Sequence, residues 1–193
     1  MIFQNKNAFE KMEFSNYKPE NNKLISKTFE NCKFINCDFS GCNFSDSFFT
    51  ECSFTNCNLS NVNLKNTRLQ KITFFECKLL GINFTEINRL FVKLSFNKSL
   101  IRDCNISELN LTGTTFTDCE INRCDFYKSN LSKTIYKGSS LPGSLFESTN
   151  LSGADFSEAI NYKINPANNK IKGAKFSYPE VLNLLSIFEI EIE

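Results

Sequence analysis

A phenylalanine or leucine at every fifth position is the feature that most constrains how this chain can fold. In the stretch FENCKFINCDFSGCNF, residues 29–44, phenylalanine occupies positions 29, 34, 39 and 44. An α-helix cannot align this series, because five residues rotate the chain by about 500° and leave successive members about 140° apart. A flat strand cannot align it either, because side chains alternate between two faces. The chain must therefore turn a corner once per repeat, and a closed coil allows each repeat to face one interior.

The series is long enough to define an architecture, and we call its members the central residues. One register of twelve runs from Phe29 to Phe84 without a polar residue, and a second register of fourteen runs from Phe91 to Phe156 with only a tyrosine as an exception. Seven residues separate Phe84 from Phe91 instead of five. The sequence therefore predicts a register slip at residues 87–90, with a kink or small bulge.

A second inward phase lies two residues before each central residue, and we call it the small inward position. All nine cysteines occupy this position, which elsewhere holds mostly Ser, Thr, Val, Ile or Ala. The remaining phases are rich in Asn, Asp, Ser, Thr, Lys and Glu, which are solvated or favour turns. Each repeat is therefore predicted to contribute one large and one small side chain to the interior.

This pattern resembles the pentapeptide-repeat family, whose repeat is a small residue, Asp or Asn, Leu or Phe, and two polar residues. The segments CDFSG at 37–41, CNFSD at 42–46, CNLSN at 57–61 and ADFSE at 154–158 are close to that consensus. The resemblance covers about residues 24 to 160. It implies an all-β solenoid, a right-handed quadrilateral parallel β-helix with four repeats in each coil.

With four repeats in each coil, cysteines twenty residues apart would stack. Cys37, Cys57 and Cys77 then form one column, at a spacing of about 4.8 Å that is compatible with a disulfide. A buried free thiol also serves as a small apolar side chain, and the chain has no histidine. The pattern favours a structural role for the thiols over a redox or metal site, and we expect no cofactor and no bound metal.

The segments outside the regular series are predicted to cover the ends of the solenoid. We divide the chain into an N-terminal cap or partial coil (1–23), a first stack (24–86), the slip (87–90), a second stack (91–160) and a C-terminal segment (161–193). In the C-terminal segment, Ser177 and Glu180 have the spacing of a capping box before an apolar helical pattern. We therefore predict a short C-terminal α-helix as a cap.

The last residues, FEIEIE, alternate apolar and acidic side chains, which is the period of a half-buried strand. An exposed apolar helix and strand edge favour burial against a second copy of the chain. We therefore predict a homodimer, with intramolecular capping as the alternative. The predicted interface residues are Val181, Leu184, Leu185, Phe188, Ile190 and Ile192.

Composition argues against several function classes. Without histidine and with only seven glycines, the sequence offers no catalytic triad, paired-carboxylate motif or phosphate-binding loop, so we expect no enzyme and no small-molecule substrate. The 22 basic and 21 acidic residues form no basic cluster of the kind that binds nucleic acid directly. Neither a signal peptide nor a membrane-spanning stretch is indicated, so the expected location is cytoplasmic.

Within the family, the layout is closest to the quinolone-resistance (Qnr-type) and microcin B17 immunity (McbG-type) proteins. Length, the break between two stacks and the ending AINYKINPANNKIKGAKFSYPEVLNLLSIFEIEIE carry this similarity. It implies dimerisation through the C-terminal end and protection of DNA gyrase or topoisomerase IV. The balanced charge favours a different hypothesis, a non-catalytic rod or scaffold that binds an unrelated partner, because a mimic of duplex DNA should be acidic.

Overall fold

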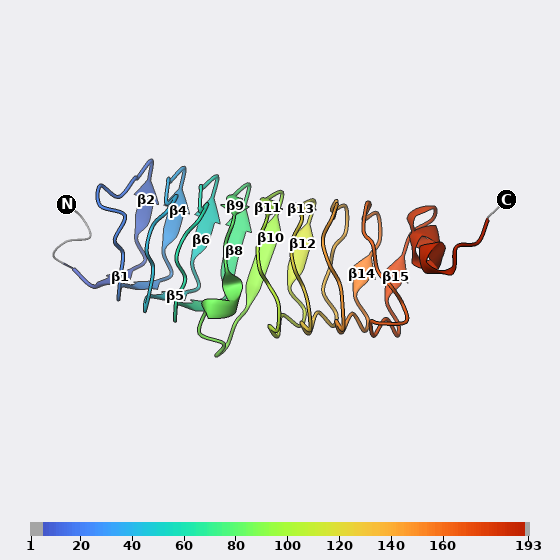
Figure 1. Cartoon of the computed structure of the whole chain (residues 1–193). Coiled ribbons are helices and arrows are strands. Elements are labelled where there is room, and N and C mark those ends of the chain that lie inside the picture. Colours follow the sequence, from blue (N-terminus) through green and yellow to red (C-terminus); the bar gives the residue numbers. More distant parts are fainter. Residues whose placement is uncertain (1–5, 192–193) are drawn as a thin grey trace.

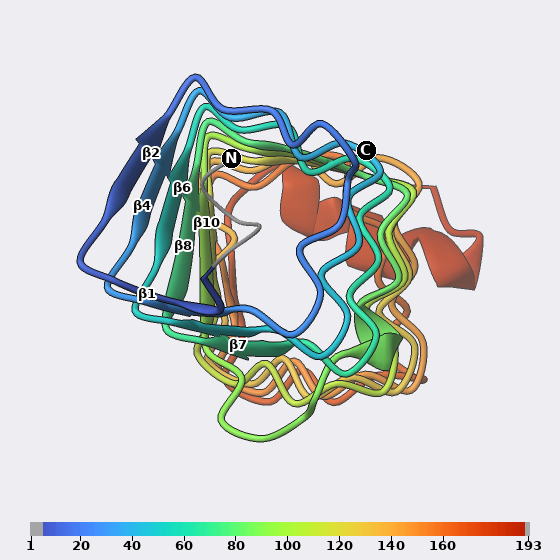
Figure 2. The ribbon, with the colours of Figure 1, turned by 90° about the vertical axis from the view of Figure 1, so that its left-hand side faces the viewer.

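The five-residue period winds the chain into a parallel β-solenoid of about eight turns, which forms an elongated rod (Figure 1). This computed structural model describes residues 6–191. Seen along its axis, each turn is four-sided (Figure 2), and the central residues fill the interior. The predicted quadrilateral β-helix is confirmed.

Short strands form the sides of the rod and pair in parallel with the strands of the next turn. One sheet has the order β1-β3-β5-β7, a second β12-β10-β8-β6-β4-β2, a third β13-β11-β9, and a fourth pairs β14 with β15. The strands are β1 (Ala8–Glu10), β2 (Glu13–Ser15), β3 (Thr28–Glu30), β4 (Lys33–Ile35), β5 (Phe48–Thr50), β6 (Ser53–Thr55), β7 (Arg68–Gln70), β8 (Ile72–Phe75), β9 (Lys78–Leu80), β10 (Leu94–Asn97), β11 (Leu100–Arg102), β12 (Thr115–Thr117), β13 (Glu120–Asn122), β14 (Asp155–Phe156) and β15 (Lys175–Phe176).

Each residue of a regular turn lies beside the residue twenty positions later. Phe34 pairs with Phe54, and Phe54 pairs with Phe74. Phe74 then pairs with Phe96, a separation of 22, and the separation returns to twenty between Phe96 and Phe116. The two extra residues between the predicted registers are thus absorbed within one turn.

The corners of the coil explain its polar consensus. The residue two positions after most central residues has a positive φ, as at Asn36 (54°), Asp46 (59°) and Gly41 (65°). Asn, Asp and Gly tolerate this left-handed conformation best. The Asn or Asp before a central residue closes the adjacent turn, since Asn43 Oδ1 accepts the Ser45 amide at 2.9 Å.

The core contains a continuous column of stacked aromatic rings. Neighbouring rings are separated by 4.6 to 5.3 Å between centroids and lie within 18° of parallel. Such offset stacking adds to the stability gained from burying the rings. The column consists of Phe14, Phe34, Phe54, Phe74, Phe96, Phe116, Tyr136, Phe156 and Phe176.

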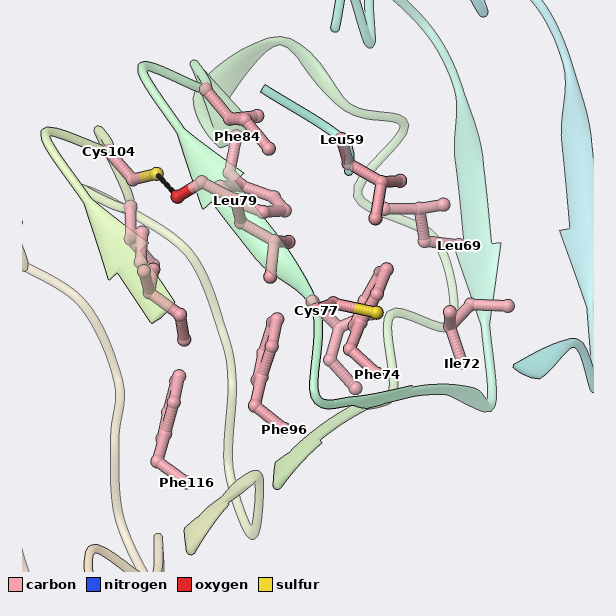
Figure 3. Packing of buried hydrophobic residues seen from close by; sticks show 14 of the residues in the cluster. Leu59, Leu69, Ile72, Phe74, Cys77, Leu79, Phe84, Phe96, Cys104 and Phe116 are labelled. Atoms are coloured by element: carbon pink, nitrogen blue, oxygen red, sulfur yellow. Dashed lines mark hydrogen bonds between the residues drawn. The ribbon is translucent and has the colours of Figure 1, made fainter. Parts of the chain in front are cut away.

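The small inward position selects hydrogen-bond donors as well as small side chains. The hydroxyl of Ser139 donates to the Phe116 carbonyl at 2.6 Å. The thiol of Cys57 donates to the Phe34 carbonyl at 3.4 Å, and Figure 3 shows the equivalent bond from Cys104 to Leu79. Cys, Ser and Thr are interchangeable here because each can donate to a carbonyl of the preceding turn.

The assignment of Phe91 as a central residue is wrong. Its side chain is 73% exposed, and its φ is 58°. The chain leaves the wall of the coil between Asn88 and Lys93 in a projecting loop (Figure 2). Because Leu94 restores the inward phase before Phe96, the loop expels Phe91 and keeps the core continuous.

Two short helices of 3₁₀ type interrupt the strands. Helix η1 (Phe84–Glu86) forms a corner just before the projecting loop, and helix η2 (Glu180–Phe188) lies at the C-terminal end, where a helix was predicted. The prediction of an α-helix is corrected, because the Leu182 amide donates to the carbonyl of Pro179, three residues earlier. Tight turns of this kind are frequent at chain ends and in connections.

One predicted detail of the C-terminal segment is wrong, and the predicted terminal strand is absent from residues 189–191 of the single chain. Ser177 forms no capping box, because its hydroxyl accepts the Glu158 amide at 3.1 Å while Pro179 occupies the cap. Residues 189–191 form no strand, since Glu189 turns the chain with a φ of 51° and no neighbouring strand lies beside them in the described chain. Ile192 lies outside the described residues.

Phe44→Asp tests the inward assignment of the central residues. Phe44 is 2% exposed, so the substitution buries an unpaired carboxylate and should lower the free energy of unfolding by more than about 4 kcal/mol. The matched control Lys65→Asp, on an exposed side chain, should change it by less than about 0.5 kcal/mol. Chemical denaturation measures both, and equal midpoints would contradict the assignment.

A pair of alanine substitutions tests the position of the slip. Phe91→Ala removes a largely exposed ring and should change the free energy of unfolding by less than about 0.5 kcal/mol. Phe96→Ala removes a ring from the buried column and should cost about 3 to 5 kcal/mol. If Phe91→Ala is the more damaging variant in thermal unfolding, Phe91 belongs to the core after all.

Candidate functional site

The nine thiols are buried and free of disulfides. Burial raises the pKa of Cys42 and Cys119 to about 11 and that of Cys52 to about 12. A thiol is a nucleophile or a metal ligand only as the thiolate. Cys37, Cys57 and Cys77 are each buried, so their column serves the core and presents no reactive group to solvent, although a hydrogen bond with Cys57 lowers the pKa of Cys77.

The interior gap near Phe44 and Phe74 is too small to admit a substrate. The gap has a volume of about 10 Å³ and is lined by apolar side chains alone. This is at the limit of the space that one water molecule needs. Within residues 6–191, no cluster of three or more His, Cys, Asp or Glu side chains is placed to hold a metal ion. In the same range, no helix is long and apolar enough to cross a lipid bilayer.

Charges on the sides of the rod pair between successive turns. The Arg123 guanidinium donates two hydrogen bonds, of 2.7 and 2.9 Å, to the Asp103 carboxylate, and this pairing lowers the pKa of Asp103. A bond of 2.7 Å from Lys18 to Asp38 lowers the pKa of that carboxyl to about 2. Similar contacts join Glu51 with Lys71, Arg102 with Glu120, and Lys137 with Glu158. In each of these pairs an acidic side chain lies beside a basic side chain of a neighbouring turn. The paired carboxylates therefore do not form an acidic stripe.

The projecting loop carries two exposed apolar side chains. Leu90 is 55% exposed and Phe91 is 73% exposed. The Asn88 side chain accepts the Leu90 amide at 3.1 Å, and Arg89 lies 4.0 Å from Glu108 of the next turn. The loop is therefore anchored at its base while its tip faces solvent.

The C-terminal end carries a larger apolar surface. Of the predicted interface residues, Leu185 is 37%, Phe188 58% and Ile190 56% exposed, whereas Val181 and Leu184 are half-buried. The structure brings the first five together on helix η2 and the residues that follow it, and Ile192 lies outside the described range. This end of the rod therefore offers exposed apolar side chains to a partner.

Sequence reasoning missed several exposed apolar residues of the last turns and the C-terminal segment. Tyr178 is 81% exposed, Leu145 63%, Ile160 44% and Ile187 37%. Leu145 and Ile160 each break a usually polar outward phase, and that signal was present in the sequence. Ile187 could not be assigned, because its exposure depends on how helix η2 lies against the last turns.

A cleft of about 890 Å³ separates helix η2 from the last turns. Its apolar lining includes Leu145, Phe146, Ile164 and Ile187, and its polar lining includes Glu147, Lys163, Asn165 and Asn183. Binding sites commonly combine such an apolar wall with a few polar groups. The C-terminal end therefore offers both a projecting apolar surface and a recess.

The sequence matches two family models. One, described as a pentapeptide repeat region, matches residues 27–110, and the other, described as pentapeptide repeats in eight copies, matches residues 95–132. Together they span residues 27–132, more than half of the 193 residues. No curated protein matches the sequence significantly.

Two solved structures align with this chain. A trypsin-treated variant of QnrB1, a plasmid-mediated fluoroquinolone resistance protein, aligns with a TM-score of 0.59 at 19% identity, covering 96% of this chain and 98% of that chain. HetL, a protein involved in heterocyst differentiation regulation in the cyanobacterium Nostoc sp. strain PCC 7120, aligns at 14% identity with a TM-score of 0.39, covering 89% of this chain and 86% of its own. At 19% identity the likeness to QnrB1 concerns the fold alone.

The burial of the thiols makes a prediction about their reactivity. A thiol reagent should label none of the nine cysteines rapidly in the native protein, and all of them after denaturation. Because the folded coil buries all nine thiols and excludes the reagent, a change from pH 7 to pH 9 should not accelerate native labelling. Rapid labelling without denaturant, or zinc at about one per chain in elemental analysis, would contradict this account.

Proposed function

This chain belongs to the pentapeptide-repeat family, and on that premise we propose that it acts by binding another protein and not by catalysis. The observation that carries the proposal is the exposed apolar surface of the C-terminal end, where Tyr178, Phe188 and Ile190 are each more than half exposed. Exposed apolar surface that gathers at one end of a molecule is costly in water and typical of protein interfaces. The buried thiols and filled core support a binding role over a chemical one.

We infer that two copies associate through this end. Helix η2 has no fully buried residue, although its sequence places Val181, Leu184 and Leu185 at helical spacing. A two-fold symmetric contact would bury the same apolar set on both copies. The result would be a rod of twice the length, with the two N-terminal ends facing outward.

We propose DNA gyrase or topoisomerase IV as the partner of this dimer, with protection against quinolones or other gyrase poisons as the outcome. Support comes from the similarity in layout to Qnr-type and microcin B17 immunity proteins and from the fold shared with QnrB1, a fluoroquinolone resistance protein. A rod of about eight turns, at about 4.8 Å per turn, also has a length comparable to a short DNA duplex.

A second candidate is a scaffold that binds an unrelated protein partner. The alternation of charges on the sides of the rod, as in the pairs Asp103–Arg123 and Asp38–Lys18, favours it. A surface that imitates DNA should attract a basic groove through an excess of acidic groups. The two candidates differ in whether topoisomerase activity responds to the protein.

A supercoiling assay separates the two candidates. Gyrase inhibited by ciprofloxacin should regain activity when the protein is added, and a variant that lacks residues 179–193 should restore none, because a monomeric rod cannot span a two-fold symmetric enzyme. Lys65→Asp, on an exposed side chain of an early turn, serves as a folded control. No response to the full chain at any ratio would contradict the topoisomerase proposal and favour the scaffold.

A further inference from the structure

The stack loses its register in the turn that precedes helix η2. Ser140 bridges to Ile160 and Asn150 to Lys170, each twenty residues apart, but Phe146 bridges to Ile164, only eighteen residues later. Asn161 occupies the expected central phase and is turned outward with a φ of 59°, while Tyr162 is buried in its place. The chain at 161–165 is therefore displaced from the turn below it.

This displacement leaves backbone groups of the preceding turn without their usual partners. At the equivalent corners of the earlier turns, the amides of Gly41, Asn61, Gly81, Asp103 and Arg123 donate to the next turn at 2.7 to 3.0 Å. The amide of Gly143 and the carbonyl of Ser144 have no such partner among residues 6–191. Because Leu141 and Phe146 on either side are paired with Ile160 and Ile164, these two groups form a short gap in the ladder, where an extended segment of another chain can supply the missing partners.

The unpaired groups lie in the cleft of about 890 Å³, since Gly143 and Ser144 both line it. Leu145, the next residue along the chain, is 63% exposed. Ile187 of helix η2 forms part of the opposite wall, and the lining carries one cation, Lys163, and one anion, Glu147. The cleft thus combines backbone hydrogen-bonding groups, apolar walls and charged groups, which suits an extended peptide with alternating apolar and charged side chains.

The chain carries a segment of this description at its own end. The sequence FEIEIE, residues 188–193, alternates apolar and acidic side chains. Phe188 and Ile190 are more than half exposed. The left-handed turn at Glu189 directs the described part of this tail past the last turn, away from the body of its own rod (Figure 1).

We propose that the cleft binds the C-terminal tail of a second copy as an extended segment, and that the two copies exchange tails. The proposal rests on the association of two copies inferred above, and it specifies the residues that make the contact. Phe188 and Ile190 of one copy would face the apolar walls formed by Leu145 and Ile187 of the other. Glu189 and Glu191 would lie near Lys163, and the free amide of Gly143 and carbonyl of Ser144 would pair with the tail backbone.

Complementation between two variants tests this exchange. Leu145→Glu alters the cleft and Ile190→Glu alters the tail, and both side chains are largely exposed, so each variant should fold with the circular dichroism of the unmodified protein. Each change buries a charge in the contact and should weaken dimerisation by at least about tenfold. Ile135→Glu, on an outward side chain that does not line the cleft, is the matched control and should dimerise normally.

Light scattering after size-exclusion chromatography gives the readout. The unmodified protein and the control should be dimers, each cleft or tail variant a monomer, and an equimolar mixture of the two variants partly dimeric, because it retains one intact tail and one intact cleft per pair. A dimer that dissociates with Ile190→Glu but persists with Leu145→Glu would overturn the cleft contact while the association through helix η2 stands. A monomeric unmodified protein, or no recovery in the mixture, would overturn the exchange.

Discussion

The ladder of backbone hydrogen bonds between successive turns, in a register of twenty residues, is the constraint on which the rest of this structure depends. Each turn can satisfy its amides and carbonyls only through the turns before and after it. Bonds such as Phe116 amide to Ile135 carbonyl, at 2.6 Å, and Ile121 amide to Ser140 carbonyl, at 2.7 Å, repeat along the rod. Once this spacing is set, every phase of the repeat forms a column.

Each column of side chains has its own role in the fold. Stacked rings such as Phe96 and Phe116 supply apolar burial, and the small inward position returns a hydrogen bond to the turn before, as from Ser139 to Phe116. The outward phases are then free to vary, and on the sides of the rod they pair charges across turns. Apolar surface collects where the ladder is interrupted, at Phe91 and around Leu145. A partner would therefore find exposed apolar side chains to bind at these interruptions and at the end of the stack.

The sequence predicted the coil and both inward phases, because these depend only on a local period. It placed Phe91 wrongly, since a count in fives cannot tell which residue of a two-residue insertion leaves the wall. It treated Cys57 as a small apolar group, because the Phe34 carbonyl that accepts its thiol comes from another turn. The cleft beside Leu145 forms because Tyr162, and not Asn161 of the expected central phase, occupies the core. The polar residue in the central phase was a visible signal, but the displacement it causes is a property of packing.

Residue-resolved hydrogen exchange of the native protein tests the central claim most directly. If the ladder is continuous apart from its interruptions, the amide of Phe116, which bonds to Ile135, should exchange only by opening of the stack and be protected by several kcal/mol (about 3 or more). The amide of Phe91, in the projecting loop, should exchange orders of magnitude faster. Equal protection of the two amides would contradict the slip, and rapid exchange at Phe116 and along β10–β12 would contradict the twenty-residue ladder itself.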